Sequence, residues 1–250
     1  MTHPLFTELL PAAPPAELVE ALRLPEGAGR SIVEYLLPKV GGDVLMAALA
    51  KTSFYTDPAS IQKHRSYPGG LVDHKLAVLF WLLRLAESMC KPNDASVTAS
   101  NVVRIALCHD LCKVGTYQRT MKSQKIKNPD GSYKTKPGTD KLDWEDVWGY
   151  EHKTAKLPLG HGEASVVLGL RLGLDLTPPE MLAIRWHMGG YDTSSDFSVS
   201  SAQRDAMGLH PLVIATQTAD LMDTYYGADR PVAEPVIRAL WPDWIPGGTP

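Results

Sequence analysis

Apolar residues recur every three or four positions through most of the chain, which is the spacing of amphipathic helices. The strongest such segment is 71–89, which is apolar around much of its circumference and therefore predicts a central buried helix. Residues 100–114 predict a second buried helix for the same reason. The same spacing predicts shorter helices over 16–24, 31–37, 43–51, 163–172, 179–187 and 210–225.

Proline and glycine mark the expected helix ends. Pro25-Glu26-Gly27 and Pro38 predict breaks on either side of the helix at 31–37. Asp43 follows two glycines and is predicted to be the N-cap of the helix at 43–51.

The helical spacing disappears between residues 115 and 160. In this segment the turn sequence Asn128-Pro129-Asp130-Gly131 lies between polar runs, which predicts a β-hairpin. We therefore expect an all-α fold with a hairpin insertion. The expected organisation is an N-terminal helical extension over 1–52, a helical domain over 53–228 with the insertion at 115–160, and a Pro-rich C-terminal tail over 229–250 packed along the surface.

Charge and cysteine content narrow the class of protein. The 250 residues carry a formal net charge of −3, which argues against a protein that coats nucleic acid or lies on a membrane surface. The longest apolar run, 76–83, is too short to cross a bilayer, and no secretory signal pattern opens the chain. Cys90, Cys108 and Cys112 do not suggest a disulfide framework, and the last two are interpreted as small buried residues. We expect a cytoplasmic protein with no membrane association.

Polar residues in apolar helices indicate a metal site. His109 and Asp110 fall in the middle of the predicted helix 100–114, where burying them is costly unless a divalent cation compensates. His74 lies near the start of the helix at 71–89, and Asp220 lies within that at 210–225. These four ligands from three helices predict one closed metal site.

Two further histidines predict a second metal ion. His161 and His187 lie at the ends of predicted helices and, with one oxygen of Asp110, complete a second ligand set. A carboxylate bridging two metals suits in-line attack on phosphorus. Lys113 shares a helix face with His109 and Asp110, so its ammonium is expected to contact the carboxylate or a bound phosphate.

The order H…HD…H…H…D resembles the HD superfamily of metal-dependent phosphohydrolases. The run P-A-S-I-Q-K-H-R-S-Y-P-G-G-L-V-D-H, over 58–74, is similar to the start of the HD domain in YhaM-type 3′→5′ exoribonucleases and in phage-encoded HD hydrolases. The runs A-L-C-H-D-L-C-K-V-G, L-G-H-G-E-A-S-V and A-I-R-W-H-M-G-G-Y-D resemble the phage and gut-bacterial group. The chain departs from the exoribonucleases because no OB-type barrel pattern precedes the domain.

The resemblance implies an HD-domain helical bundle, with the hairpin inserted between the second and third metal-ligand segments. It implies one or two divalent ions (Mn, Fe, Zn or Mg), and the imidazole-rich ligand set favours the first three. The expected function is cleavage of nucleotide phosphate esters by a metal-activated hydroxide, as in a nucleotidase or dNTP hydrolase. Asp110 and Lys113 are the expected catalytic residues. The expected substrate contacts are Lys63, His64, Arg65 and Lys113.

Alternatives remain open at this point. A 3′→5′ exonuclease on single-stranded RNA or DNA ends, a di-iron oxygenase of the same superfamily and a non-catalytic binding module fit parts of the pattern. Lys63, His64 and Arg65 also fit a solvated polar loop, although the resemblance favours a function for His64. No oligomeric state follows from the sequence.

Several polar residues outside this set have two interpretations. Glu163 either accepts a bond from His161 or stabilises a helix start, and Asp223 either orients a ligand or faces solvent. His3, His152 and His210 are predicted to be surface or capping residues.

The predicted hairpin is locally basic and is followed by aromatic residues. One interpretation is a solvated hairpin. The other is a lid or substrate wall whose basic and aromatic residues bind a nucleic-acid strand or stack on a base. Its charged and aromatic residues are Arg119, Lys122, Lys125, Lys127, Asp130, Lys134, Lys136, Asp140, Lys141, Trp144, Trp148 and Tyr150.

Overall fold

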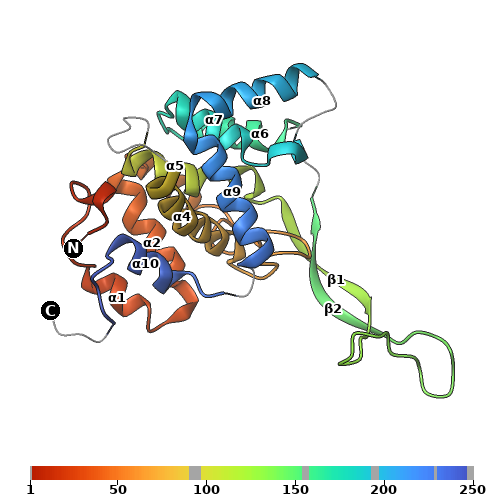
Figure 1. Cartoon of the computed structure of the whole chain (residues 1–250). Helices are drawn as coiled ribbons and strands as arrows, with labels where there is room; N and C mark the ends of the chain where they lie inside the picture. Colours follow the sequence, from red (N-terminus) through yellow and green to blue (C-terminus); the bar gives the residue numbers. More distant parts are fainter. Residues whose placement is uncertain (1, 90–96, 154–157, 193–196, 228–229, 247–250) are drawn as a thin grey trace.

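The computed structural model describes residues 2–89, 97–153, 158–192, 197–227 and 230–246, so Cys90 lies outside the described part (Figure 1). The described chain is mostly helical with one antiparallel pair of strands, which confirms a helical fold with a hairpin. The α-helices are α1 (Ala16–Ala21), α2 (Pro25–Lys39), α3 (Asp43–Leu49), α4 (Gly70–Met89), α5 (Ala99–Cys108), α6 (His161–Arg171), α7 (Pro178–Trp186), α8 (Phe197–Leu209), α9 (Pro211–Tyr226) and α10 (Ala233–Leu240). Short 3₁₀ turns cover Pro4–Phe6, Leu111–Lys113 and Gly189–Asp192.

Helix α4 is the centre of the molecule, as its apolar circumference predicts. It packs against α9, α5, α10 and α2 (Figure 1). Leu76, Leu79, Leu82 and Leu83 are fully buried along it, and burying each such side chain stabilises the fold by roughly 1.5–3 kcal/mol. This packing positions the N-terminal part of α4, which carries His74.

One predicted helix break and one predicted cap are wrong. Pro25 begins α2 rather than ending a helix, because the first helical position needs no N–H donor and suits the fixed φ of proline. The break predicted at Pro38 agrees to within one residue, because Pro38 lies in the last turn of α2 and the helix ends at Lys39. Gly42 is the N-cap of α3, so Asp43 lies in the first turn, where its charge is favourable at the positive end of the helix dipole.

Helix α5 is shorter than predicted, and this changes the position of His109 and Asp110. The helix ends at Cys108, His109 is its C-cap, and a 3₁₀ turn follows at Leu111–Lys113. The expectation that His109 and Asp110 lie mid-helix is therefore wrong. Successive residues of a regular helix point about 100° apart, so leaving the helix here allows both side chains to face the same interior.

The structure contains helix α8, which the sequence pattern did not predict. The prediction that the C-terminal tail packs along the surface is also wrong. Helix α10 lies within the expected tail and buries Val236, Ile237 and Leu240 completely. Trp241 is also fully buried and donates Nε1–H to the carbonyl of Pro11 at 2.8 Å. Residues from both ends of the chain thus share one core.

The hairpin projects from the helical body as a two-stranded arm (Figure 1). Strand β1 (Tyr117–Lys125) pairs antiparallel with β2 (Trp144–His152). The predicted second strand is misplaced, because the turn at 128–131 closes only an isolated bridge between Lys127 and Tyr133. Within the described residues, no helix combines the length and apolar composition needed to cross a membrane.

Candidate metal centre

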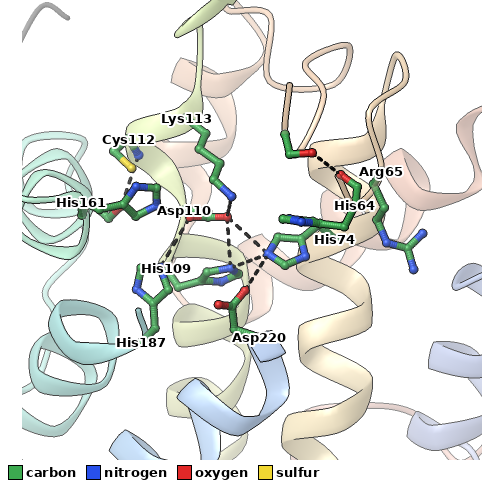
Figure 2. A network of polar contacts seen from close by, with 12 residues as sticks. His64, Arg65, His74, His109, Asp110, Cys112, Lys113, His161, His187 and Asp220 are labelled. Atoms are coloured by element: carbon green, nitrogen blue, oxygen red, sulfur yellow. Dashed lines mark hydrogen bonds and ion pairs between the residues drawn. The ribbon is translucent and has the colours of Figure 1, made fainter. Parts of the chain in front are cut away.

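The residues predicted to bind metal converge from five helical elements at one end of the α4–α9 core (Figure 2). His74 lies near the N-terminus of α4, and Asp220 lies in α9. His109 and Asp110 follow α5. His161 is the first residue of α6, and His187 is the C-cap of α7.

His74, His109 and Asp220 form the more buried group. Their potential ligand atoms all lie within 4.8 Å of one another. Nε2 of His74 lies 3.1 Å from Oδ1 of Asp220 and 3.3 Å from Oδ2 of Asp110. Nε2 of His109 lies 3.4 Å from the same Asp110 oxygen. Together with Asp110, the group fits one cation held by two imidazoles and two carboxylates.

In three of the histidines, the ring nitrogen Nδ1, which points away from the centre, contacts an oxygen atom. Nδ1 of His74 lies 2.8 Å from Oδ2 of Asp223, and Nδ1 of His109 lies 2.9 Å from the carbonyl of Ala106. Nδ1 of His187 lies 2.7 Å from the carbonyl of Ile184. These oxygens only accept, so each Nδ1 carries a proton and each ring directs its Nε2 towards the centre.

The facing nitrogens of His74 and His109 need a proton or a metal ion between them. Nε2 of His109 and Nε2 of His74 lie 3.2 Å apart, a separation that two lone pairs tolerate only if a proton or a metal ion intervenes. Among the described residues, Nε2 of His187 is buried and has no hydrogen-bond partner. Such an orphaned acceptor in a carboxylate-lined interior fits a metal ligand.

The pKa values of the buried site residues depend on burial and on the carboxylates that would also bind a metal. Burial opposes charge on His74, but hydrogen bonds with Asp110, Asp220 and Asp223 prevail and raise its pKa to about 10. Burial alone dominates at His109 and lowers its pKa to about 3. Burial opposes ionisation of Asp220, but its bond to His74 keeps its pKa below the usual value. A metal ion would therefore displace a proton from the His74 imidazole.

Asp110 lies between this group and a second one (Figure 2). Its Oδ1 lies 2.5 Å from Nε2 of His161 and 3.5 Å from Nε2 of His187. Ligand atoms of Asp110, Cys112 and His161 lie within 4.8 Å of one another. The structure thus brings the expected second set together and adds Cys112, which sequence reasoning assigned to the core.

Lys113 is buried beside Asp110. Its Nζ is 2.7 Å from Oδ2 of Asp110, as the three-residue spacing predicts. Burial opposes the charge on Lys113, but Asp110 and Asp220 prevail and raise its pKa above the usual value. Burial opposes ionisation of Asp110 in turn, and Lys113 is the main cause of its low pKa.

His64 lies against the site from the other side. Its ring packs on that of His74, with centroids 4.9 Å apart. Both ring nitrogens are buried and have no hydrogen-bond partner in the described part of the chain. Burial lowers its pKa to about 4, so the ring is neutral at pH 7 and offers one donor and one acceptor. The predicted role of His64 in substrate binding stays a prediction, as does that of the exposed Lys63.

Arg65 does not face the site, contrary to expectation. Its Nε and Nη2 donate to the two oxygens of Asp223 at 2.9 and 2.8 Å, and Nη2 also donates to the carbonyl of Gly227. The side chain is 1% exposed, so it is inaccessible to substrate. Arg65 instead holds Asp223, and Asp223 binds Nδ1 of His74. The solvent-facing interpretation of Asp223 is wrong, because its side chain is fully buried.

Glu163 stabilises the start of α6. Its Oε2 accepts from the backbone N–H of Gly160 at 3.2 Å, and its Oε1 pairs with Arg185 at 2.9 Å. The helix-start interpretation of Glu163 is therefore the one that the contacts support. This cap fixes the N-terminal turn in which His161 lies.

The three remaining histidines lie outside the site. His3 caps a 3₁₀ turn as predicted, but it is buried and pairs with Glu87. His210 is the N-cap residue of α9, and His152 is exposed at the end of β2.

Lys75, which directly follows His74 in α4, is a buried cation that the sequence pattern did not reveal. It is fully buried, and among the described residues its Nζ has no hydrogen-bond partner. Burial lowers its pKa to about 8, although Asp110 opposes this shift. Lys75 therefore adds positive potential beneath Asp110.

Comparisons of the chain with protein-family models, with curated proteins and with solved structures returned no match.

Proposed function

We propose that this chain is a metal-dependent phosphohydrolase of the HD superfamily that cleaves phosphate esters of nucleotides. The observation that carries the proposal is the common orientation of His74, His109 and His187, whose protonated Nδ1 atoms bind oxygens and whose Nε2 atoms face Asp110 and Asp220. The order of these residues along the chain and the HD-like sequence around them support the same assignment.

The site suits two cations. His74, His109, Asp110 and Asp220 would hold the first, and Asp110, His161 and His187 would hold the second, with Cys112 close by. When bound, such ions supply Lewis acidity towards a phosphoryl oxygen and towards water. The mixed imidazole and carboxylate donors suit Mn, Fe or Zn better than Mg.

The chain itself supplies charge and orientation. In the hydrolysis, water oxygen bonds to phosphorus, the bond from phosphorus to the leaving oxygen breaks, and that oxygen takes a proton. Lys113 keeps a positive charge beside Asp110, where it would stabilise the negative charge that develops on the phosphoryl group. His64, with its unpartnered ring nitrogens, would bind an oxygen of the substrate.

Metal analysis of protein purified without chelators, followed by a nucleotide hydrolysis screen with that metal, tests the proposal. We expect bound transition metal, and we expect His109→Ala and Asp110→Ala to lose both metal and activity. His210→Ala and Asp205→Asn are matched controls outside the site and should retain both. Protein without metal, or full activity in the two site variants, would contradict the proposal.

A di-iron oxygenase is the second candidate, because a carboxylate between two imidazole-rich groups also suits paired iron ions. Iron as the purified metal, together with substrate-dependent O₂ uptake and no phosphate release, would favour it.

A further inference from the structure

The arm formed by β1 and β2 exposes large aromatic side chains away from the helical core. Trp144 is 51% and Trp148 61% exposed, and Met121 and Tyr133 are about half exposed. Nothing in the described part of the chain covers this surface, since the arm projects from the body (Figure 1). Exposed tryptophans of this kind mark an interaction surface.

The strand register places the aromatic residues on one face. Residues two apart on a strand share a face. Because Met121 pairs with Trp148, and Lys125 pairs with Trp144, both tryptophans lie on the same side of the ribbon. Arg119, Tyr150, Tyr117 and His152 belong to that side too. We call this side the aromatic face.

Cations lie over aromatic rings on this face and in the loop that follows β1. The guanidinium of Arg119 lies 4.6 Å from the centroid of Trp148. Nζ of Lys125 lies 5.7 Å from Trp144 and 5.2 Å from Tyr133, and Lys127 lies 5.7 Å from Tyr133. The acidic residue of the face, Asp146, accepts a bond from Ser123 at 2.5 Å. Alternating aromatic rings and cations complement the bases and phosphates of a nucleic-acid strand.

The aromatic face begins at the candidate metal centre. Lys113, which contacts Asp110, is followed four residues later by Tyr117, the first residue of β1. Asp57 fixes this junction by accepting from Gly115 N–H at 2.7 Å and from Ser53 Oγ at 2.9 Å. The nine residues of β1 extend the face by about 30 Å from the metal site.

We propose that the aromatic face binds single-stranded nucleic acid and presents its end to the metal centre. The binding stands on the arm alone, while the presentation for hydrolysis rests on the proposed function. Bases stack on Trp144 and Trp148, and the cations of Arg119, Lys125 and Lys127 meet the phosphates. A single strand fits better than a duplex, because stacking on side chains needs unpaired bases.

Fluorescence anisotropy of a labelled oligothymidylate, titrated with the full chain in EDTA to prevent hydrolysis, tests the binding. We expect Trp144→Ala and Trp148→Ala each to weaken binding by roughly 5- to 140-fold. We expect binding to weaken with salt, and Lys125→Ala to reduce the slope of log K against log salt by about 0.7.

Gln118→Ala and Gln124→Ala are matched controls, because both residues are exposed on the opposite face of the same strand. They should bind as the parent chain does. A duplex of the same length should bind less tightly than the single strand. Equal binding by the tryptophan variants, or no binding by the parent chain, would overturn the proposal.

Two further outcomes separate this inference from the proposed function. Tryptophan-dependent binding without hydrolysis of any phosphate ester would leave the arm assignment standing and remove the proposed function. Hydrolysis of mononucleotides without oligonucleotide binding would support the proposed function and contradict the assignment of the arm. A dimer that light scattering detects and Trp148→Ala dissociates, with no oligonucleotide binding, would instead assign the face to a second copy of the chain.

Discussion

Asp223 accepts a hydrogen bond from Nδ1 of His74 at 2.8 Å and thereby fixes which ring nitrogen faces the metal centre. Partners of this kind raise the basicity of a ligating histidine, and their loss typically weakens metal binding by about 10- to 100-fold. We therefore expect Asp223→Asn to weaken binding of the first metal by about that factor, measured by competition with a chromophoric chelator.

The exposed Asp205 on α8 provides the control, since Asp205→Asn removes the same charge far from His74. Unchanged metal affinity in Asp223→Asn would show that the His74 orientation does not depend on Asp223.

Arg65 and Asp223 form a fully buried pair with two parallel hydrogen bonds. Removing one partner of such a pair leaves an uncompensated buried charge and costs about 3–5 kcal/mol. We expect Arg65→Ala to lower the free energy of unfolding by that amount in urea titrations. Arg65 also has a φ of 47°, so its loop conformation depends on these bonds.

Lys63 is the natural comparison, because it lies in the same loop but is exposed. Lys63→Ala should change stability by less than about 0.5 kcal/mol. Equal losses in the two variants would contradict the structural role of Arg65.

Acid should remove the contribution that ionised Asp223 makes to the free energy of unfolding. Burial opposes its ionisation, but hydrogen bonds from His74 and Arg65 prevail and lower its pKa to about 2. The unfolded value is about 3.9. Because the folded pKa is the lower one, the stabilisation is complete above about pH 4 and is lost as the pH falls towards 2. The stability difference between the parent chain and Asp223→Asn, measured by urea unfolding with EDTA present, should shrink across this range. A difference independent of pH would argue against the assignment.

The sequence predicted which polar residues come together at the candidate metal centre better than it predicted their backbone. Polar residues in apolar surroundings indicate His74, His109, Asp110 and Asp220 wherever the helix ends fall, since burial demands compensation in any geometry. The end of α5 at Cys108 was missed because apolar spacing continues to Val114 while the backbone turns. Helix propensity depends on local sequence, so it cannot predict a helix end that tertiary packing determines.

The contacts around the candidate metal ligands could not be predicted from the sequence for a related reason. Arg65 and Asp223 are 158 positions apart, and their pairing depends on how the loop before α4 lies against α9. The fold of the C-terminal segment was hidden by its prolines, although Val236, Ile237 and Leu240 have helical spacing. The hairpin was found, but a long tip loop displaced its second strand.

Cys112 should ligate the second metal ion. Its sulfur lies within 4.8 Å of ligand atoms of Asp110 and His161, and thiolate is a strong ligand for zinc and cobalt. We expect the Co²⁺-loaded protein to show thiolate-to-cobalt absorption, and Cys112→Ala to lose it and to retain the first metal.

Cys108 is the matched control, because it is fully buried in the core and burial raises its pKa to about 12. Cys108→Ala should retain the absorption. If Cys112→Ala retains it too, the second ion binds without the thiolate.

Trp241 tests whether the C-terminal segment belongs to the core. Its side chain is fully buried among the residues of the main apolar cluster, and Nε1–H binds the carbonyl of Pro11. Replacing a buried tryptophan by alanine costs about 3–5 kcal/mol. We expect Trp241→Ala to lose that amount in urea unfolding, whereas Trp244→Ala should lose less, because Trp244 is only partly buried. A loss below 1 kcal/mol for Trp241→Ala would return this segment to the surface, where its proline content had suggested it lies.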